Sequence, residues 1–206
     1  MLSLTTRIEN GFRGEDRIAH RRTRGGTLLV VADGAGGVGG AAAAAQHVCE
    51  SIAARADDAR GNVDFWVRAL REEDAVLARS AHGGLTTAVI VEVHDSRVLG
   101  ASVGDSGALM ISATGIVELT EFQHRKPLLG SGMTRPVAFG PLPISGRLLV
   151  ATDGLLKYAS LERVAWLCRS LALGHSADAL LQSVRLSSGA YHDDVAFALA
   201  EWRASD

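Results

Sequence analysis

The sequence predicts an α+β protein in which a two-layered β core carries helices on its outside. Helical and strand-like patterns come in separate blocks, with two helices, a run of strands, two more helices and a final strand. The central strands follow one another through tight turns such as 94–96, which is typical of antiparallel pairing. The chain has 206 residues, of which 47% are hydrophobic, and this length suits one well-cored domain better than two. We therefore expect a single domain over residues 1–206.

Composition and charge exclude several classes of protein. A net charge of −2 and a pI near 6.4 give no sign of a surface for nucleic acid or for an anionic membrane. The first twenty residues contain no apolar signal-peptide core, and no later run approaches the length of a membrane span. Cys49 and Cys168 lie on apolar faces of helical patterns, where buried free thiols are expected rather than a disulfide or a zinc site. These observations predict a cytoplasmic protein with neither nucleic acid nor membrane as a partner.

The first half of the chain predicts three strands and two helices. The first helix is rich in alanine and has apolar residues at helical spacing. The second is expected to begin behind Asn62, whose side chain is a good N-cap. In order, the elements are strands over 2–8, 17–20 and 27–32, a helix over about 41–55, and a helix after residue 62. The two helices should form one layer over a sheet.

The second half predicts an antiparallel meander followed by two helices and a last strand. The expected strands are 87–93, 98–103, 108–111, 147–152 and 195–200, and the helices begin behind Ser160 and Ser176. Residues 121–146 carry all four prolines of the chain. Irregular segments of this length in a compact domain are usually lids or binding loops. We therefore expect an irregular, flap-like segment at 121–146.

Aspartates stand at the ends of several apolar runs. Residues 28–34 read Leu-Leu-Val-Val-Ala-Asp-Gly, and residues 148–154 repeat this frame as Leu-Leu-Val-Ala-Thr-Asp-Gly. Taken singly, an acid in such a place is more often a turn former or a helix cap. Four acids together suggest carboxylates that converge on one point, where their repulsion requires a hard cation such as Mg²⁺, Mn²⁺ or Ca²⁺. The four are Asp33, Asp105, Asp153 and Asp193.

Two short motifs suggest other chemistry. Residues 34–39 read Gly-Ala-Gly-Gly-Val-Gly between a strand and a helix, as in dinucleotide-binding proteins. Asp33 would place a carboxylate beside the pyrophosphate, and no second strand with an acidic end follows directly, which weighs against this interpretation. Residues 104–107, Gly-Asp-Ser-Gly, match the nucleophile motif of trypsin-like serine proteases. That fold is all-β with few helices, whereas this chain has four clear helical patterns.

Taken together, the acidic motifs resemble those of the metal-dependent serine/threonine protein phosphatases, the type 2C (PPM) family and its bacterial relatives. Residues 14–17, Gly-Glu-Asp-Arg, look like the first acidic motif of that family, and residues 31–37 are similar to its Asp-Gly-x-Gly-Gly motif. The resemblance covers essentially the whole chain in order. Its further pieces are residues 84–88, 103–107, 119–124, 151–155 and 192–195.

The resemblance implies a four-layer α-β-β-α sandwich, with two antiparallel sheets flanked by helix pairs and a binuclear Mn²⁺ or Mg²⁺ centre at one end. Two cations would lower the pKa of a shared water, so that hydroxide attacks the phosphoryl group without a protein nucleophile. By position, the resemblance implies that Asp33 would bridge the two cations. Asp153 and Asp193, the other catalytic acids, would complete the site of one cation. The second cation would be held by Glu15, Asp16 and the Gly34 carbonyl. Asp194 stands where the family usually has asparagine, so Asp193 is the better ligand.

The chain departs from the family pattern at several positions. Ala35 replaces a histidine that is proposed as general acid in animal relatives, so leaving-group protonation would fall to water or another group. Arg13 is the substitute for the phosphate-binding arginine, and Gly107 replaces the arginine of the Gly-Asp-Ser motif. Asp105 would help to hold a third metal ion. Lys157, which stands where the family commonly has aspartate and could pair with Asp105 instead, argues against that ion.

The leading hypothesis is a metal-dependent protein phosphatase that hydrolyses phosphoserine and phosphothreonine by a metal-bridging hydroxide. The alternative is a phosphatase-like regulatory or binding module with weak or no catalysis, in which Ala35, Gly107 and Lys157 mark the decay of activity. The expected partners are a phosphoprotein substrate and a cognate protein kinase or its target. We expect the protein to be a monomer.

Overall fold

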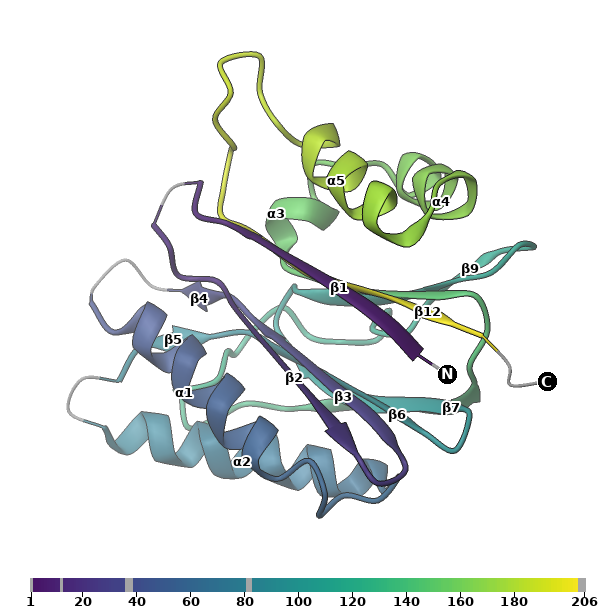
Figure 1. The fold of residues 1–206 in the computed structure, drawn as a ribbon. Coiled ribbons are helices and arrows are strands. Elements are labelled where there is room, and N and C mark those ends of the chain that lie inside the picture. Colours follow the sequence, from purple (N-terminus) through teal and green to yellow (C-terminus); the bar gives the residue numbers. More distant parts are fainter. Residues whose placement is uncertain (1, 12, 36–38, 81–82, 204–206) are drawn as a thin grey trace.

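The computed structural model describes residues 2–11, 13–35, 39–80 and 83–203. Within these residues, two five-stranded antiparallel sheets face each other, and helices cover the outer face of each sheet (Figure 1). A small sheet pairs β4 (Gly34–Ala35) with β5 (Leu85–Thr86) beside them. The predicted α+β class and the four-layer α-β-β-α sandwich are therefore confirmed.

The first large sheet has the strand order β1-β12-β11-β8-β9. Its central strand β11 has the sequence Arg-Leu-Leu-Val-Ala and is buried along its whole length, because the second sheet covers one face and helices cover the other. The strands are β1 (Leu2–Glu9), β12 (Val195–Trp202), β11 (Arg147–Ala151), β8 (Gly107–Ile111) and β9 (Ile116–Glu118). The helices on this side are α3 (Asp153–Leu156), α4 (Leu161–Ser170) and α5 (Leu173–Ser183).

The second large sheet has the strand order β10-β7-β6-β3-β2, and its outer face is covered by α1 (Ala41–Ala54) and α2 (Val63–Arg79). The start of α2 is the predicted one, since the Asn62 side chain accepts a hydrogen bond from the Asp64 backbone N–H. The strands are β10 (Val137–Pro143), β7 (Arg97–Val103), β6 (Ala88–His94), β3 (Gly26–Ala32) and β2 (Arg17–Thr23).

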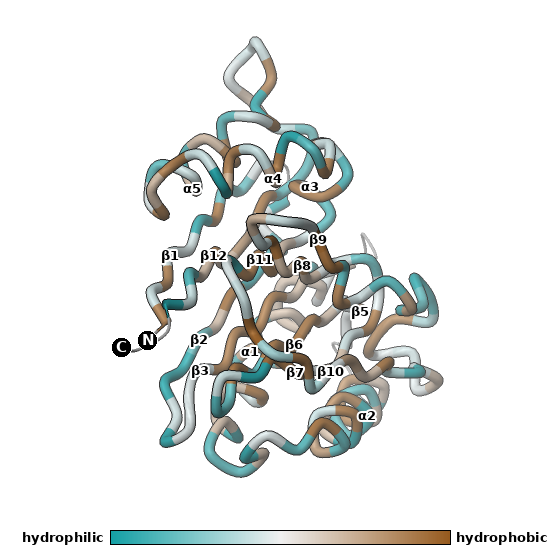
Figure 2. The backbone as a smooth tube through the Cα atoms, turned by 90° about the vertical axis from the view of Figure 1, so that its right-hand side faces the viewer, coloured by the Kyte–Doolittle hydropathy of each residue, from teal (hydrophilic) through white to brown (hydrophobic). Residues whose placement is uncertain are grey.

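Three apolar layers hold the sandwich together, and β3 shows how one strand serves two of them. Leu29 and Val31 pack between the sheets, whereas Leu28 and Val30 pack under α1 and α2. Full burial of such a side chain contributes roughly 1.5–3 kcal/mol relative to exposure. Figure 2 shows the hydrophobic colour concentrated in the strands at the centre, with hydrophilic turns around them.

The pairing registers bring several strand ends to one edge of the sandwich. In the first sheet Ala151, at the end of β11, pairs with Phe197 near the start of β12. In the second sheet Val31, near the end of β3, pairs with Val89, and the end of β7 at Val103 pairs with the neighbouring Ala88. The two sheets pack with these edges together, because carboxylate oxygens of Asp33, Asp105 and Asp153, which follow β3, β7 and β11, lie within 4.8 Å of one another.

The structure differs from the prediction in the segment 121–146. The segment contains the strand β10, which was not expected because it includes Pro141 and Pro143. A proline lacks the N–H that a central strand must donate, but β10 is the outermost strand of its sheet, where this loss is tolerated. The sequence pattern thus missed an edge strand.

The helices after β11 also differ in part. α4 begins behind Ser160, whose hydroxyl accepts the Arg163 N–H as predicted. The predicted start behind Ser176 is wrong, because α5 begins at Leu173 and Ser176 is buried inside it. α3 was not expected, since its four residues are too few to show a helical period.

Cys49 and Cys168 are buried free thiols, as expected. Among the described residues, no helix has both the length and the apolar character needed to cross a membrane.

Candidate metal centre

Asp33 is the first residue after β3, and its backbone is fixed by hydrogen bonds from a neighbouring motif. The Asp33 N–H donates to the Thr87 hydroxyl at 2.9 Å, and the Thr87 N–H donates to the Asp33 carbonyl at 2.8 Å. The Thr87 and Ser106 hydroxyls share a further hydrogen bond at 2.7 Å. Both hydroxyl residues are buried. The direction in which the Asp33 carboxylate leaves the sheet is therefore set by three separate segments of the chain.

The glycine that follows each of the two repeated aspartates is required by close backbone contacts. A Cβ atom at Gly34 would lie 2.5 Å from the Ala41 carbonyl oxygen at the start of α1. A Cβ atom at Gly154 would lie 1.9 Å from the Asp194 carbonyl oxygen. Any side chain at either position would push these segments apart. The repeated Asp-Gly pairs thus let other backbone segments approach the acids closely.

Three carboxylates meet at this edge of the sandwich. Asp33, Asp105 and Asp153 each offer an oxygen, and these oxygens lie within 4.8 Å of one another. Asp33 follows β3, Asp105 follows β7, and Asp153 opens α3 directly after β11. Carboxylate oxygens at this spacing are the donor set that Mg²⁺ and Mn²⁺ prefer. The residues present therefore fit a divalent cation.

The electrostatics of the cluster also favour a cation. Burial, followed by the nearby charges of Asp16 and Asp153, raises the pKa of Asp33 to about 9. Burial likewise raises the pKa of Asp16 to about 7, and one oxygen of that buried side chain has no hydrogen-bond partner. Burial and the charge of Asp105 raise the pKa of Asp153. The ionised acids thus destabilise one another, and a bound cation would relieve this repulsion.

The loop before β2 is held over the cluster by Asp194. The Asp194 carboxylate accepts the backbone N–H of Arg13 at 3.1 Å and that of Glu15 at 2.7 Å. The Glu15 carbonyl in turn accepts the Gly34 N–H at 3.3 Å. The Arg13 guanidinium is half-exposed and lies 3.9 Å from the Glu15 carboxylate. Asp194 therefore positions the residues of this loop through their backbone.

A cavity of about 360 Å³ opens in front of these residues. Its wall includes His192, whose ring stacks on that of Tyr158 with the centroids 4.6 Å apart. Ala35, at the position of the absent histidine, also lies in the wall and contributes no proton donor. The predicted site residues in the wall are Arg13, Glu15, Asp33, Gly34, Asp153 and Asp193.

Every predicted site residue thus lies at one edge of the sandwich, but in different positions. Asp105 belongs to the tight cluster, whereas Asp193 lies outside it. The negative charge of Asp193 nevertheless helps to raise the pKa of Asp33 and that of Asp153. Asp16 is buried beside Asp33. The ion pair considered between Lys157 and Asp105 is not formed. Lys157 lies 5.3 Å from the Tyr158 ring centroid instead.

Sequence reasoning missed some residues that shape the site. The guanidinium of Arg125 lies 3.6 Å from the Asp105 carboxylate, and nothing in its local sequence indicates this contact. Thr87 and Ser106 lay in motifs that the sequence analysis had identified, although their role as supports of Asp33 was not predicted. Their small hydroxyl side chains directly beside the acidic motifs were the available signal.

A family model described as Stage II sporulation protein E (SpoIIE) matches residues 23–203 of the chain. The chain belongs to the SpoIIE family. Glu15 and Asp16 precede the matched part of this SpoIIE-family protein. The resemblance to bacterial metal-dependent phosphatases of the PPM family is thereby confirmed together with the structural matches. No curated protein sequence matches the chain.

Solved structures of bacterial phosphatases share the fold of this SpoIIE-family protein. A bacterial serine phosphatase has 20% sequence identity and a TM-score of 0.85, with 100% of each chain covered. The serine/threonine phosphatase Stp1 from Staphylococcus aureus has 22% identity and a TM-score of 0.83, with 99% of this chain and 96% of that chain covered. The catalytic domain of the serine/threonine protein phosphatase PstP, solved with 2 manganese ions, has 22% identity, a TM-score of 0.79 and 97% coverage of each chain.

Proposed function

We propose that this protein is a metal-dependent phosphatase that hydrolyses phosphoserine and phosphothreonine in proteins. The observation that carries the proposal is the cluster of Asp33, Asp105 and Asp153, whose carboxylate oxygens lie within 4.8 Å of one another. Each acid comes within two residues of the end of a core strand, so the sandwich itself sets the spacing. Membership of the SpoIIE family and the fold shared with bacterial serine/threonine phosphatases support the proposal.

The cofactor in this proposal is a pair of divalent cations, Mn²⁺ or Mg²⁺. When bound, they would neutralise charge on the phosphoryl group and lower the pKa of water. Asp33 is the acid that serves both cations in this proposal, because in addition to its burial the charges of Asp16, Asp153 and Asp193 all act on its carboxyl and raise its pKa. The proposed ligands are Asp33, Asp153 and Asp193 for one cation, and Asp33 with Glu15, Asp16 and the Gly34 carbonyl for the other. Asp105 lies in the same cluster and would add its negative charge beside the first cation, whereas the Arg125 guanidinium 3.6 Å from it disfavours a separate third cation.

The remaining residues of the cavity bind and orient the substrate in this proposal. The half-exposed Arg13 guanidinium is the group that takes a phosphate oxygen, and Asp194 holds its backbone in place. Gly34 and Ala35 present little or no side chain, which leaves room for a tetrahedral phosphate next to the acids. A phosphoserine side chain is long enough to enter such an open cavity from a flexible protein segment.

The wider biological role follows from this activity. We propose that the whole chain, residues 1–206, is one phosphatase domain that works in the cytoplasm as a monomer. Its partners are a phosphoprotein and the kinase that phosphorylates it. The segment 121–146 is proposed as the flap that borders the site, because Arg125 reaches from it to Asp105.

The test is hydrolysis of p-nitrophenyl phosphate by the purified protein during titration with Mn²⁺ and Mg²⁺, with EDTA as the metal-free reference. We expect activity only with metal, and a fall of at least about a hundredfold in kcat/KM for Asp153→Asn. Asp58→Asn is the matched control, because Asp58 is an exposed acid in the connection between α1 and α2. A phosphoserine peptide should then be hydrolysed as well. Equal activity of Asp153→Asn and Asp58→Asn would refute the proposal.

A regulatory or binding module remains the second candidate, favoured by the absence of a proton donor at Ala35 in the cavity wall. The same titration separates the two functions. A module would bind Mn²⁺ in calorimetry and release no p-nitrophenol at any metal concentration. An enzyme would show both, and the metal concentration for half-maximal activity would match the calorimetric Kd.

A further inference from the structure

Asp74 is a buried acid on α2 whose carboxylate binds the backbone of a distant loop. Only 4% of the residue is exposed. Its Oδ1 atom accepts the N–H groups of Gly130 and Gly132 at 2.8 and 2.9 Å, and its Oδ2 atom accepts that of Thr134 at 2.9 Å. Hydrogen bonds to an ionised acceptor are about twice as strong as those between neutral groups. One side chain of α2 therefore holds three alternate residues of the segment 121–146.

The loop has the backbone shape that this arrangement requires. Gly130 and Gly132 have φ angles of 93° and 72°, in the left-handed region that glycine adopts readily. N–H groups that converge in this way suit an anion, and here the anion is the Asp74 carboxylate. A Cβ atom at Gly130 would lie 2.4 Å from the Gly84 carbonyl oxygen, so the loop packs closely on the segment that leads into β5.

The residue before this loop is tied to the small sheet that carries Gly34. Leu129 is fully buried, and it exchanges two backbone hydrogen bonds of 3.1 Å with Thr86. Thr86 also pairs with Gly34 in the sheet of β4 and β5. The Thr86 hydroxyl lies 2.9 Å from the Asp33 carbonyl oxygen. The loop held by Asp74 therefore meets, through Thr86, the backbone of two residues of the proposed metal centre.

We propose that Asp74 is a positioning residue for the metal centre, an inference that rests on the cation site of the proposed phosphatase. Asp74 fixes the loop, the loop fixes Leu129 and Thr86, and these hold the Gly34 carbonyl and the Asp33 backbone in place. A ligand that can shift binds metal more weakly, because binding must then also restrict its motion. Loss of a group that orients a metal ligand directly typically costs about 10–100-fold in metal affinity. Because Asp74 acts through Thr86, its effect should be smaller.

The experiment compares Mn²⁺ binding by the wild type, Asp74→Ala and Asp74→Asn in isothermal titration calorimetry. Asp74→Ala should raise the Kd about three- to tenfold, because all three N–H groups of the loop lose their acceptor. Asp74→Asn keeps one acceptor oxygen, so its Kd should lie between the other two. In EDTA, amide hydrogen exchange measured by NMR should be faster at Thr86 and Leu129 in Asp74→Ala than in the wild type. This second measurement requires neither metal nor activity.

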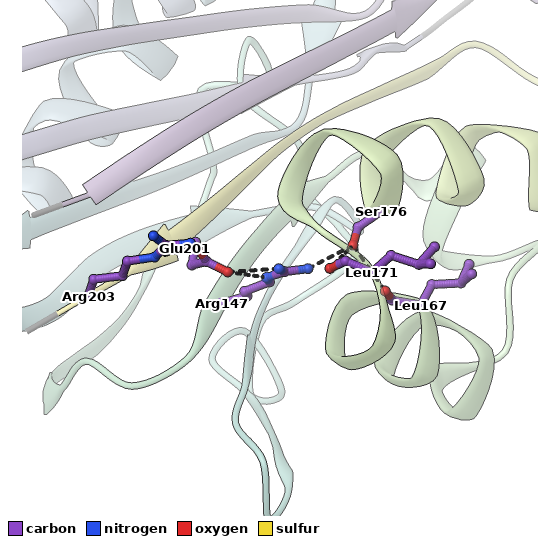
Figure 3. A network of polar contacts seen from close by, with 6 residues as sticks. All are labelled: Arg147, Leu167, Leu171, Ser176, Glu201 and Arg203. Atoms are coloured by element: carbon purple, nitrogen blue, oxygen red, sulfur yellow. Dashed lines mark hydrogen bonds and ion pairs between the residues drawn. The ribbon is translucent and has the colours of Figure 1, made fainter.

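Ser176→Ala is the matched control, because Ser176 is also a fully buried polar residue by which a helix is anchored (Figure 3). Its hydroxyl accepts a hydrogen bond from Nη1 of Arg147 at 2.7 Å. Arg147 starts β11, whereas Asp153 follows the other end of that strand, so the control lies away from the acids. Ser176→Ala should lower the Tm and leave both the Kd for Mn²⁺ and the exchange at Thr86 unchanged.

Equal Kd values for Asp74→Ala and Ser176→Ala would overturn the proposal, as would exchange at Thr86 that Asp74→Ala leaves unchanged. If Asp74→Ala does not fold, the same two comparisons are made with Asp74→Asn. A wild type that binds no Mn²⁺ would overturn this proposal and the phosphatase proposal together. A wild type that binds Mn²⁺ and releases no p-nitrophenol would refute the phosphatase activity alone, and the difference in Kd would still support the role of Asp74.

Discussion

Replacing Asp33 with asparagine should stabilise the metal-free protein at alkaline pH. The carboxyl is buried beside Asp16 and Asp153, and its pKa is raised from 3.8 to about 9. An acid with a raised pKa binds its proton more tightly in the folded than in the unfolded protein. The free energy of unfolding is therefore highest below the unfolded-state pKa and falls as the pH rises toward 9. Asparagine cannot ionise, so the variant should lose this pH dependence.

The magnitude follows from the window between pH 7 and pH 9. Two pH units at about 1.4 kcal/mol each set an upper limit near 3 kcal/mol for a single group. Asp33 titrates together with the neighbouring acids, and we assign about 1–2 kcal/mol of this loss to its own ionisation. For a chain of this size each kcal/mol corresponds to about 2–4 °C in Tm. The wild type should therefore melt about 2–8 °C lower at pH 9 than at pH 7.

The assay is thermal unfolding by circular dichroism in EDTA at both pH values. Asp58→Asn is the control, since it removes an exposed acid and keeps the buried cluster. Wild type and Asp58→Asn should show the full pH dependence, and Asp33→Asn a clearly smaller one. With Mn²⁺ at about a hundred times its Kd, the wild type should gain about 2.7 kcal/mol, while Asp33→Asn should gain little. Equal pH dependence in all three proteins would show that the acids do not interact as described.

Substitutions at three further positions test the supports of the fold and the site. Thr87→Val should lower the free energy of unfolding by about 1–3 kcal/mol in urea denaturation, because the Asp33 N–H loses its buried acceptor, and Thr87→Ser should restore most of it. Trp66→Phe should destabilise by about 2–3 kcal/mol by the same measurement, since the fully buried Glu92 carboxylate loses the indole N–H at 2.7 Å. Asp194→Ala should raise KM for the phosphate ester, because it frees the loop that carries the proposed phosphate ligand, and an unchanged KM would argue against that role.

The carboxylate cluster could be predicted from sequence because each acid directly follows an apolar strand. Strand ends are the points at which a chain leaves the core, so two copies of one strand-Asp-Gly frame fix where two carboxylates emerge. The packing of the two sheets then brings the ends of β3 and β11 together, since the Asp33 and Asp153 carboxylate oxygens lie within 4.8 Å of each other. The predicted N-cap at Asn62 belongs to the same kind of local rule, in which one side chain meets a backbone group two residues away.

The features that could not be predicted depend on contacts between distant residues. Ser176 looks like a helix cap in sequence, but its hydroxyl is taken by Arg147, 29 positions away, and by carbonyls of the preceding helix. The strand β10 contains prolines that only its edge position tolerates, and edge position is a property of the assembled sheet. Arg125 reaches Asp105 only because the segment 121–146 folds back over the end of β7. None of these contacts has a local sequence signal.

The buried acids also explain why the metal centre and the stability of the sandwich are linked. Asp33 belongs to the cluster and Asp16 is buried next to it, and burial raises the pKa of both carboxyl groups. Ionisation of either acid therefore lowers the free energy of unfolding. An apolar pair of the same shape would stabilise the core better without metal. A cation that binds the folded state and not the unfolded chain raises the free energy of unfolding, and this gain increases with metal concentration. Only with such a cation is the arrangement of buried acids favourable. The stability of this protein should therefore follow the supply of Mn²⁺ or Mg²⁺, with the strongest dependence at the pH where the acids are most fully ionised.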